Sequence, residues 1–213
     1  SIFTGGIELD FEKIVAHLRE QAYLVKGLRI TIIDARKSET KLPKPGEALY
    51  MRTSLSGSSS KSFYFEGGLR SLVSFYNRYQ KPVHKNIFYV EGALGCVLVV
   101  FAFQFMDDIF SCVFWFGNFI YTQEGGTHIT GFRTALTRTL NAYGRKSGTL
   151  REAQENLTGE DVLEGLTAVV SVKLREIQFE GQTKGKLGSV EAQGAVAGVF
   201  AEAFGEFLEE DAD

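Results

Sequence analysis

The chain has 213 residues, of which 44% are hydrophobic and 23% charged, and its formal net charge is -3. This composition is typical of a globular protein with one good core, or one domain plus part of another, and it excludes a surface that is basic throughout. The longest apolar run, residues 95–105, is shorter than the about 20 residues that cross a bilayer, and residues 1–10 lack a signal-peptide pattern, so we expect a cytoplasmic protein without a membrane span.

The first predicted helix begins behind Asp10, whose side chain is of the kind that caps helix N-termini. Gly27 stands where a helix-ending glycine is expected. Residues 28–32 alternate between apolar and polar, which predicts a strand with one buried face. Residues 37–62 are rich in Pro, Gly and Ser and lack periodicity, so we expect a long, mobile loop there. The apolar positions of the helix are Phe11, Ile14, Val15, Leu18 and Ala22.

A second predicted helix starts after Gly67 and Gly68, where a short strand at 63–65 gives way to helical spacing. We place a domain boundary at these glycines, which divides the chain into domains 1–67 and 68–213. The face of this helix that we expect to be buried carries Leu69, Leu72, Val73 and Tyr76.

Three apolar segments, 86–91, 95–105 and 109–117, are rich in β-branched and aromatic residues, and they predict a meander of antiparallel strands. The middle segment is apolar on both faces, so helices must pack on at least one of them. Cys96 and Cys112 fall in these strands. A disulfide between them is possible in geometry, but such bonds are rare in reducing compartments, so we expect two buried free thiols.

A longer amphipathic helix is predicted at 129–143. Beyond it, Thr158 and Asp161 are typical of a capping pair before a short helix that ends near Gly165. A strand at 166–174, a glycine-rich loop at 179–188 and a helix at 189–210 complete the chain. In the helix at 129–143 the apolar face is Phe132, Leu136, Leu140 and Tyr143, and the polar arc is Arg133, Thr137, Arg138 and Asn141.

Charge is segregated along the chain. Residues 133–151 carry five basic side chains and no acidic one, whereas residues 206–213 are acidic. A local basic face fits either an ordinary solvated helix surface or a surface that binds phosphates. The five basic residues are Arg133, Arg138, Arg145, Lys146 and Arg151.

Three stretches, in this order and spacing, resemble the transducer domain that type IIA topoisomerases carry in gyrase B and in ParE of topoisomerase IV. The resemblance implies an α+β fold, like domain 2 of ribosomal protein S5, with helices packed on a mixed sheet and a left-handed crossover. It also implies that residues 68–213 are the transducer, and that residues 1–67 are the C-terminal remnant of a GHKL-type ATP-binding domain. The stretches are Gly125-Gly126-Thr127-His128 with Gly131-Phe132-Arg133 and Asn141-Ala142-Tyr143; Leu157-Thr158-Gly159-Glu160-Asp161 with Glu164-Gly165-Leu166; and Gln182-Thr183-Lys184.

The resemblance implies roles for a few of these residues. Lys184, with Gln182 beside it, would contact the terminal phosphate of ATP held by the neighbouring domain; without the resemblance, Lys184 reads as a solvated surface lysine. Arg133 would line the cavity that holds double-stranded DNA, and we extend this role more weakly to Arg138 and Lys146. ATP and magnesium would belong to the complete protein, and neither is expected to bind this fragment alone.

Other residues give no sign of a catalytic or metal site. His128 begins a helix without clustered Cys or carboxylate partners, so a structural histidine is favoured over a metal ligand. No Ser, Cys or carboxylate pair has the neighbours that a nucleophile or an acid-base centre needs, so we predict no catalytic residue in this fragment.

The resemblance also implies partners. They are the missing ATPase core of the same polypeptide, a second copy in a homodimeric clamp, and the topoisomerase partner called gyrase A or ParC. Together they would form an ATP-hydrolysing DNA topoisomerase that couples the nucleotide to strand passage. An alternative from another class is a stand-alone, non-catalytic binding module with an S5-like fold.

Overall fold

The computed structural model describes residues 9–36 and 58–210. The chain divides into two compact units, Ser1–Gly68 and Leu69–Asp213. Most of the predicted loop at 37–62 lies outside the described residues. No helix within the described ranges is long and apolar enough to cross a bilayer.

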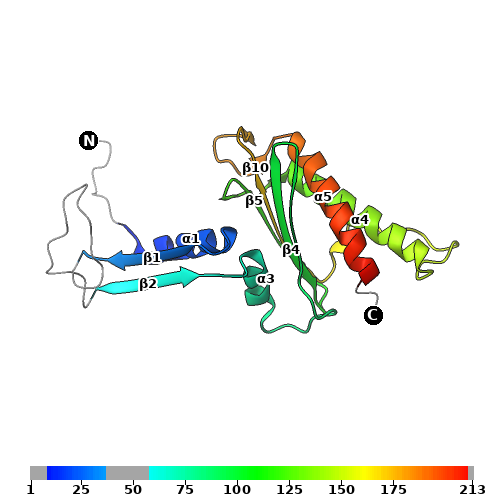
Figure 1. The fold of residues 1–213 in the computed structure, drawn as a ribbon, viewed down its shortest axis with the longest axis horizontal. Helices are drawn as coiled ribbons and strands as arrows, with labels where there is room; N and C mark the ends of the chain where they lie inside the picture. Colours follow the sequence, from blue (N-terminus) through cyan, green and yellow to red (C-terminus); the bar gives the residue numbers. More distant parts are fainter. Residues whose placement is uncertain (1–8, 37–57, 211–213) are drawn as a thin grey trace. The chain divides into compact units, whose positions relative to one another are not determined.

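Within 9–36 and 58–68, the described part of the first unit, the structure has helix α1 and a two-stranded antiparallel sheet (Figure 1). Helix α1 (Phe11–Leu24) starts at Asp10, whose carboxylate accepts the Lys13 N–H at 3.2 Å, so the predicted helix and its cap are confirmed. Strand β1 (Arg29–Asp34) pairs with β2 (Ser59–Tyr64). The prediction that the loop extends to residue 62 is therefore wrong. Residues from Ser59 on form a strand because their backbone pairs with β1, although this serine-rich run has little apolar surface.

The second unit is built on a five-stranded mixed sheet with the order β3-β4-β8-β5-β6 (Figure 1). Strand β8 pairs antiparallel with β4 and parallel with β5. The predicted antiparallel meander is therefore wrong beyond its first pair, since β8 separates β4 from β5. Seven of the eight residues of β8 are buried, which explains why it occupies the centre of the sheet. The strands are β3 (Phe88–Leu94), β4 (Val97–Phe105), β5 (Cys112–Gly117), β6 (Ile120–Tyr121) and β8 (Leu166–Lys173).

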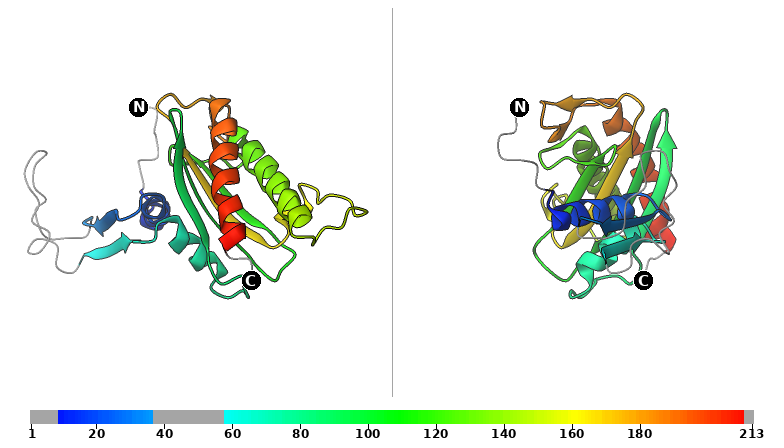
Figure 2. Two further views of the ribbon diagram at one scale, coloured as in Figure 1. Left: turned by 45° about the vertical axis from the view of Figure 1, so that its right-hand side comes forward. Right: turned by 90° about the vertical axis from the view of Figure 1, so that its left-hand side faces the viewer.

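Helices cover both faces of this sheet. Helices α4 (Thr127–Lys146) and α5 (Glu191–Glu210) lie side by side on one face, as Figure 2 shows, and α3 (Leu69–Asn77) packs on the other. The alternation in β4 explains the two layers: Phe101 and Phe103 point into the core under α4 and α5, while Ala102 is buried on the opposite side. The prediction of an α+β fold with helices on a mixed sheet is confirmed.

An aromatic cluster fills the core between the sheet and the helix pair. The ring centroids of neighbouring members lie 4.7 to 6.5 Å apart, mostly in edge-to-face or tilted arrangements. Burying each of these rings contributes about 1.5 to 3 kcal/mol, so they fix the distance between helices and sheet. The cluster contains Phe88, Phe101, Phe103, Phe132, Phe200 and Phe204.

Short elements complete the second unit. The Asp161 N–H donates to the Thr158 hydroxyl oxygen at 3.3 Å and the Thr158 N–H donates to the Asp161 carboxylate at 2.7 Å, which are the reciprocal bonds of the predicted capping pair before the 3-10 helix η1 (Asp161–Leu163). Hydrogen bonds from Thr158 lower the pKa of Asp161. Strands β7 (Gly125–Gly126), β9 (Phe179–Glu180) and β10 (Lys186–Leu187) form a small sheet in the order β7-β10-β9, so the predicted loop at 179–188 is in fact a short hairpin.

Both cysteines are free. Cys96 is exposed in the turn between β3 and β4, so the prediction of a buried thiol is wrong there. Gly95, with φ of 60°, ends the strand pattern one residue earlier and makes the turn. Cys112 is partly buried at the start of β5, and burial raises the pKa of its thiol.

Candidate functional site

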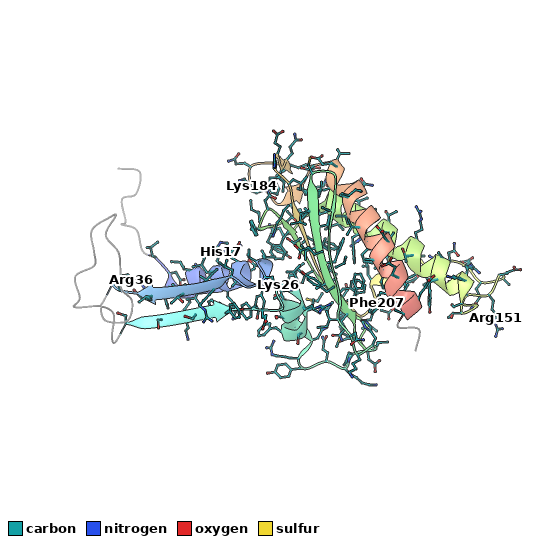
Figure 3. The ribbon with its side chains drawn as sticks, in the orientation of Figure 1. His17, Lys26, Arg36, Arg151, Lys184 and Phe207 are labelled. Carbon is teal, nitrogen blue, oxygen red and sulfur yellow. The ribbon has the colours of Figure 1, made fainter. Side chains whose placement is uncertain are left out.

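The Gln-Thr-Lys stretch forms the tip of the hairpin between β9 and β10. Gln182, Thr183 and Lys184 are all exposed, and Figure 3 shows Lys184 at the edge of the second unit. The Lys184 ammonium lies 5.9 Å from the centroid of the Phe179 ring, and it makes no ion pair within the described ranges. Lys184 is thus exposed on a glycine-flanked turn, and its contact with ATP stays a prediction.

The backbone of Lys184 has a left-handed conformation, with φ of 56°. A lysine in this region costs about 1 kcal/mol or more, and such residues cluster at functional sites. Its N–H points to the Gly181 carbonyl at 3.4 Å, which closes the turn. The turn therefore fixes the direction in which the side chain leaves the loop.

The hairpin is attached to the rest of the unit through its second strand. Strand β10 pairs with β7, which leads directly into α4. Glu124 N–H donates to the Gly185 carbonyl at 2.9 Å, next to Lys184. On the other side, the Lys186 ammonium lies 2.9 Å from the Glu180 carboxylate, which pairs the two strands of the hairpin. The tip, Gln182 to Lys184, is exposed beyond these pairings.

His128 lies in the first turn of α4 and is completely buried. Its Nε2 lies 3.0 Å from the Thr122 hydroxyl, and its ring meets Trp115 edge-on at 5.9 Å between centroids. Burial lowers the pKa of His128 to about 4, so the ring is neutral at pH 7. These contacts indicate a packing role, and no group of three metal-ligating side chains occurs within 9–36 and 58–210.

Two of the basic residues of α4, Arg133 and Arg138, are exposed. Neither guanidinium makes a hydrogen bond or an ion pair with any part of the chain that the structure describes. They are five positions apart in the sequence, so they point about 140° apart around the helix axis. They are available to anions, but not to the same anion.

The basic residues at the other end of α4 have partners. The Arg145 guanidinium donates to the Gln154 carbonyl at 2.6 Å, to the Asn156 side chain at 2.7 Å and to the Arg151 carbonyl. The Lys146 ammonium donates to the Glu209 carboxylate on α5, and this bond raises the pKa of Lys146. Arg151 projects beyond the helix end (Figure 3). The basic stretch therefore contains residues that organise a loop as well as residues that face solvent.

The sequence did not identify the residues that hold the Lys184 loop. They include Gly126, whose φ of 134° and contact with Leu187 leave no room for a side chain. The Gly125-Gly126 pair was the available signal, since it precedes a helix without a capping side chain. The partner of Lys146 could have been sought in the acidic residues 206–213, but nothing local in the sequence pairs the two segments.

Comparison with known proteins identifies relatives of this chain. The DNA gyrase B family matches residues 68–213. The DNA gyrase B protein of Bacillus mycoides is 42% identical over 210 residues, covering 99% of this chain and 47% of that protein. The DNA gyrase B protein of Clostridium acetobutylicum is 43% identical, covering 96% of this chain and 29% of that protein. The chain thus spans about half or less of the length of these relatives.

Solved structures show the same fold. The 43K ATPase domain of Thermus thermophilus gyrase B, in complex with an aminocoumarin, aligns with a TM-score of 0.79 at 35% identity, covering 98% of this chain and 50% of that one. The topoisomerase IV ATP-binding domain of Francisella tularensis aligns with a TM-score of 0.74 at 22% identity, over 97% of this chain and 50% of that one. The family match covers most of the chain, and the chain belongs to the DNA gyrase B family.

Proposed function

We propose that this chain is part of the ATP-operated clamp of a bacterial type II DNA topoisomerase, and that its Gln-Thr-Lys loop couples ATP hydrolysis to strand passage. The observation that carries the proposal is the Lys184 ammonium, which is exposed at the tip of a fixed turn and makes no ion pair within the described ranges. A lysine is a compact cation on a flexible stem, well suited to a phosphate oxygen.

The coupling depends on a phosphate that exists only before hydrolysis. While ATP is bound, Lys184 and the nearby Gln182 contact its terminal phosphate in the ATP-binding core of the same polypeptide. When that phosphate leaves, the contact is lost. A ligand shifts a conformational equilibrium only by its different affinity for the two states, and Lys184 supplies such a difference.

We further propose that residues 1–67 end the ATP-binding domain and that residues 68–213 form the transducer. Two observations support this division: the compact units meet at Gly68, and the family match begins at residue 68. The cofactors proposed for the complete protein are ATP and magnesium. Three partners complete the proposed cytoplasmic assembly. They are a second copy of this protein, the partner subunit gyrase A or ParC, and double-stranded DNA.

DNA is proposed to contact α4. Arg133 is exposed without a partner within the described ranges, so its guanidinium can bind a backbone phosphate. Arg138 is equally free but points to another side of the helix. Lys146 can join them only by leaving Glu209. Contacts of this kind are independent of base sequence and weaken with salt.

The test is Lys184→Ala in the complete protein. Because a charge-assisted hydrogen bond contributes about 1.5 to 3 kcal/mol, we expect kcat for ATP hydrolysis to fall about tenfold to a hundredfold. Lys186→Ala is the matched control, since that ammonium is paired with Glu180 on the same hairpin. Equal ATPase rates in the two variants would reject the proposal.

A further inference from the structure

Ser189 lies at the base of the Lys184 hairpin, where three segments of the second unit meet. It is 1% exposed, and its hydroxyl accepts the Gln178 N–H at 2.8 Å. Its carbonyl accepts the Thr127 hydroxyl proton at 2.6 Å. The Gly188 N–H donates to the Gln178 carbonyl at 2.9 Å, closing the hairpin base. Ser189 therefore joins both ends of the hairpin to the first residue of α4.

Strand β10, which leaves the hairpin, is also held to the segment that precedes α4. The β7–β10 ladder pairs Lys186 with Gly125 and Leu187 with Gly126, and a side chain at Gly126 would collide with the Leu187 backbone. Closer to the tip, Gly185 is bonded to Glu124. The backbone on the C-terminal side of Lys184 is thus held to the segment that leads into α4 at successive residues.

The first turns of α4 are themselves fixed in the core. His128 and Phe132 are completely buried. The centroid of the Phe132 ring lies 5.9 Å from that of Phe101 and 5.0 Å from that of Phe200. Because packed interiors move in discrete arrangements and resist continuous deformation, this part of α4 cannot shift without repacking. The hairpin base that is bonded to it shares that constraint.

We propose that Thr127 and Ser189 are positioning residues for Lys184. The hydroxyl of Thr127 fastens the hairpin base to the N-terminus of α4, and the hydroxyl of Ser189 fastens the strand that enters the hairpin. Together they make the Lys184 tip and the first turns of α4 one body. The inference rests on the proposed contact between Lys184 and ATP, and it adds the device that aims the lysine.

The test compares three threonine variants in the complete protein. Thr127→Val removes the hydroxyl but keeps the side-chain shape, and Thr127→Ser keeps the hydroxyl. Thr134→Val is the matched control, because among the residues that the structure describes the Thr134 hydroxyl bonds only within α4, to the Thr130 carbonyl at 2.8 Å. Since one such bond contributes about 0.5 to 1.5 kcal/mol, we expect Thr127→Val to lower kcat about threefold to tenfold, with Thr127→Ser and Thr134→Val near the parent.

A second measurement shows whether Thr127 acts through Lys184. In a Lys184→Ala background, Thr127→Val should have no further effect on kcat, and hydrogen exchange in residues 178–189 should still rise when the Thr127 hydroxyl is removed. If Thr127→Val lowers kcat by the same factor with or without Lys184, or matches Thr134→Val, the positioning role is wrong. If Lys184→Ala itself leaves hydrolysis unchanged, the proposed function is what fails, and the positioning role falls with it.

Discussion

The two halves of α4 use similar side chains for different purposes. In the first half, His128 and Phe132 are buried and Arg133 extends freely from the other side. In the second half, the exposed Lys146 is paired with α5, and Arg145 holds the loop at 151–156. A stretch that reads as one basic face in the sequence therefore combines two kinds of cation. Arg133 and Arg138 face solvent without a partner among the described residues, whereas Arg145 and Lys146 at the C-terminal end are bonded to other segments.

The largest expected effect comes from His128 in the first half of α4, which makes the free energy of unfolding depend on pH. Burial lowers the pKa of His128 to about 4 in the folded protein, whereas an unfolded histidine titrates near about 6.5. The unfolded chain therefore binds more protons between these values, and stability is lost as the pH falls through this window. We expect His128 to contribute a loss of about 3 kcal/mol between pH 7 and pH 4.

Equilibrium unfolding of the 213-residue chain across this range measures the effect. His128→Gln is the control, because an amide does not titrate. The variant starts from a lower stability at pH 7, but its stability should fall less steeply below pH 6.5. The same steepness in both proteins would show that His128 does not titrate in this way.

Each half of α4 also contains a buried glycine, and the two should respond differently to alanine. A Cβ at Gly131 would collide with the Gln193 backbone carbonyl of α5, which cannot give way. At Gly144 it would lie 2.9 Å from the end of the Leu150 side chain, which can rotate. We expect Gly131→Ala to lower the free energy of unfolding by about 2 kcal/mol and Gly144→Ala to change it by less than about 1 kcal/mol. Denaturant titration of both variants decides, and equal losses would contradict the difference in packing.

Removing Arg145 should be felt mainly in the loop that it holds. Arg145→Ala leaves the Gln154 carbonyl and the Asn156 side chain without their donor, and we expect a loss of about 1.5 kcal/mol in stability. Arg138→Ala, which removes a guanidinium that has no partner within the described ranges, should change stability by less than about 0.5 kcal/mol. Thermal unfolding with hydrogen exchange of residues 149–157 checks both values; similar exchange in the two variants would refute the structural role of Arg145.

Arg133→Ala should have the smallest effect on stability, below about 0.5 kcal/mol. Its effect is expected in the complete protein with DNA, where the slope of log affinity against log salt should become shallower by about 1. Lys146→Ala should change that slope less, because Glu209 already neutralises the ammonium. A larger change in slope for Lys146→Ala than for Arg133→Ala would contradict the proposal that DNA contacts Arg133 while Lys146 stays paired with Glu209.

Local patterns were sufficient to predict several elements. The carboxylate of Asp10, the alternation through Phe101 to Phe103 and the pair Thr158 with Asp161 each act over a few residues, and each is confirmed. The exposed position of Lys184 was also expected, because lysine side chains are usually solvated. Local sequence determines caps, turns and the two faces of a strand, so these features can be read without a partner.

Features that depend on distant partners could not be predicted. The position of β8 between β4 and β5 is set by burial of a whole strand, and no short pattern states which neighbours it takes. Arg133 and Arg145 both lie in the basic stretch, and only the fold of residues 151–156 distinguishes them. The link from Ser189 to Thr127 spans 62 positions in the sequence, so neither residue reveals the other.

The exposed turn at Cys96 provides a chemical handle on the native chain. Only two cysteines occur, and the thiol of Cys112 is partly buried with a raised pKa, so at neutral pH less of it is in the reactive thiolate form. A maleimide fluorophore should therefore attach first to Cys96. Labelling at this position would report on the β3–β4 end of the sheet by fluorescence, without any substitution in the protein.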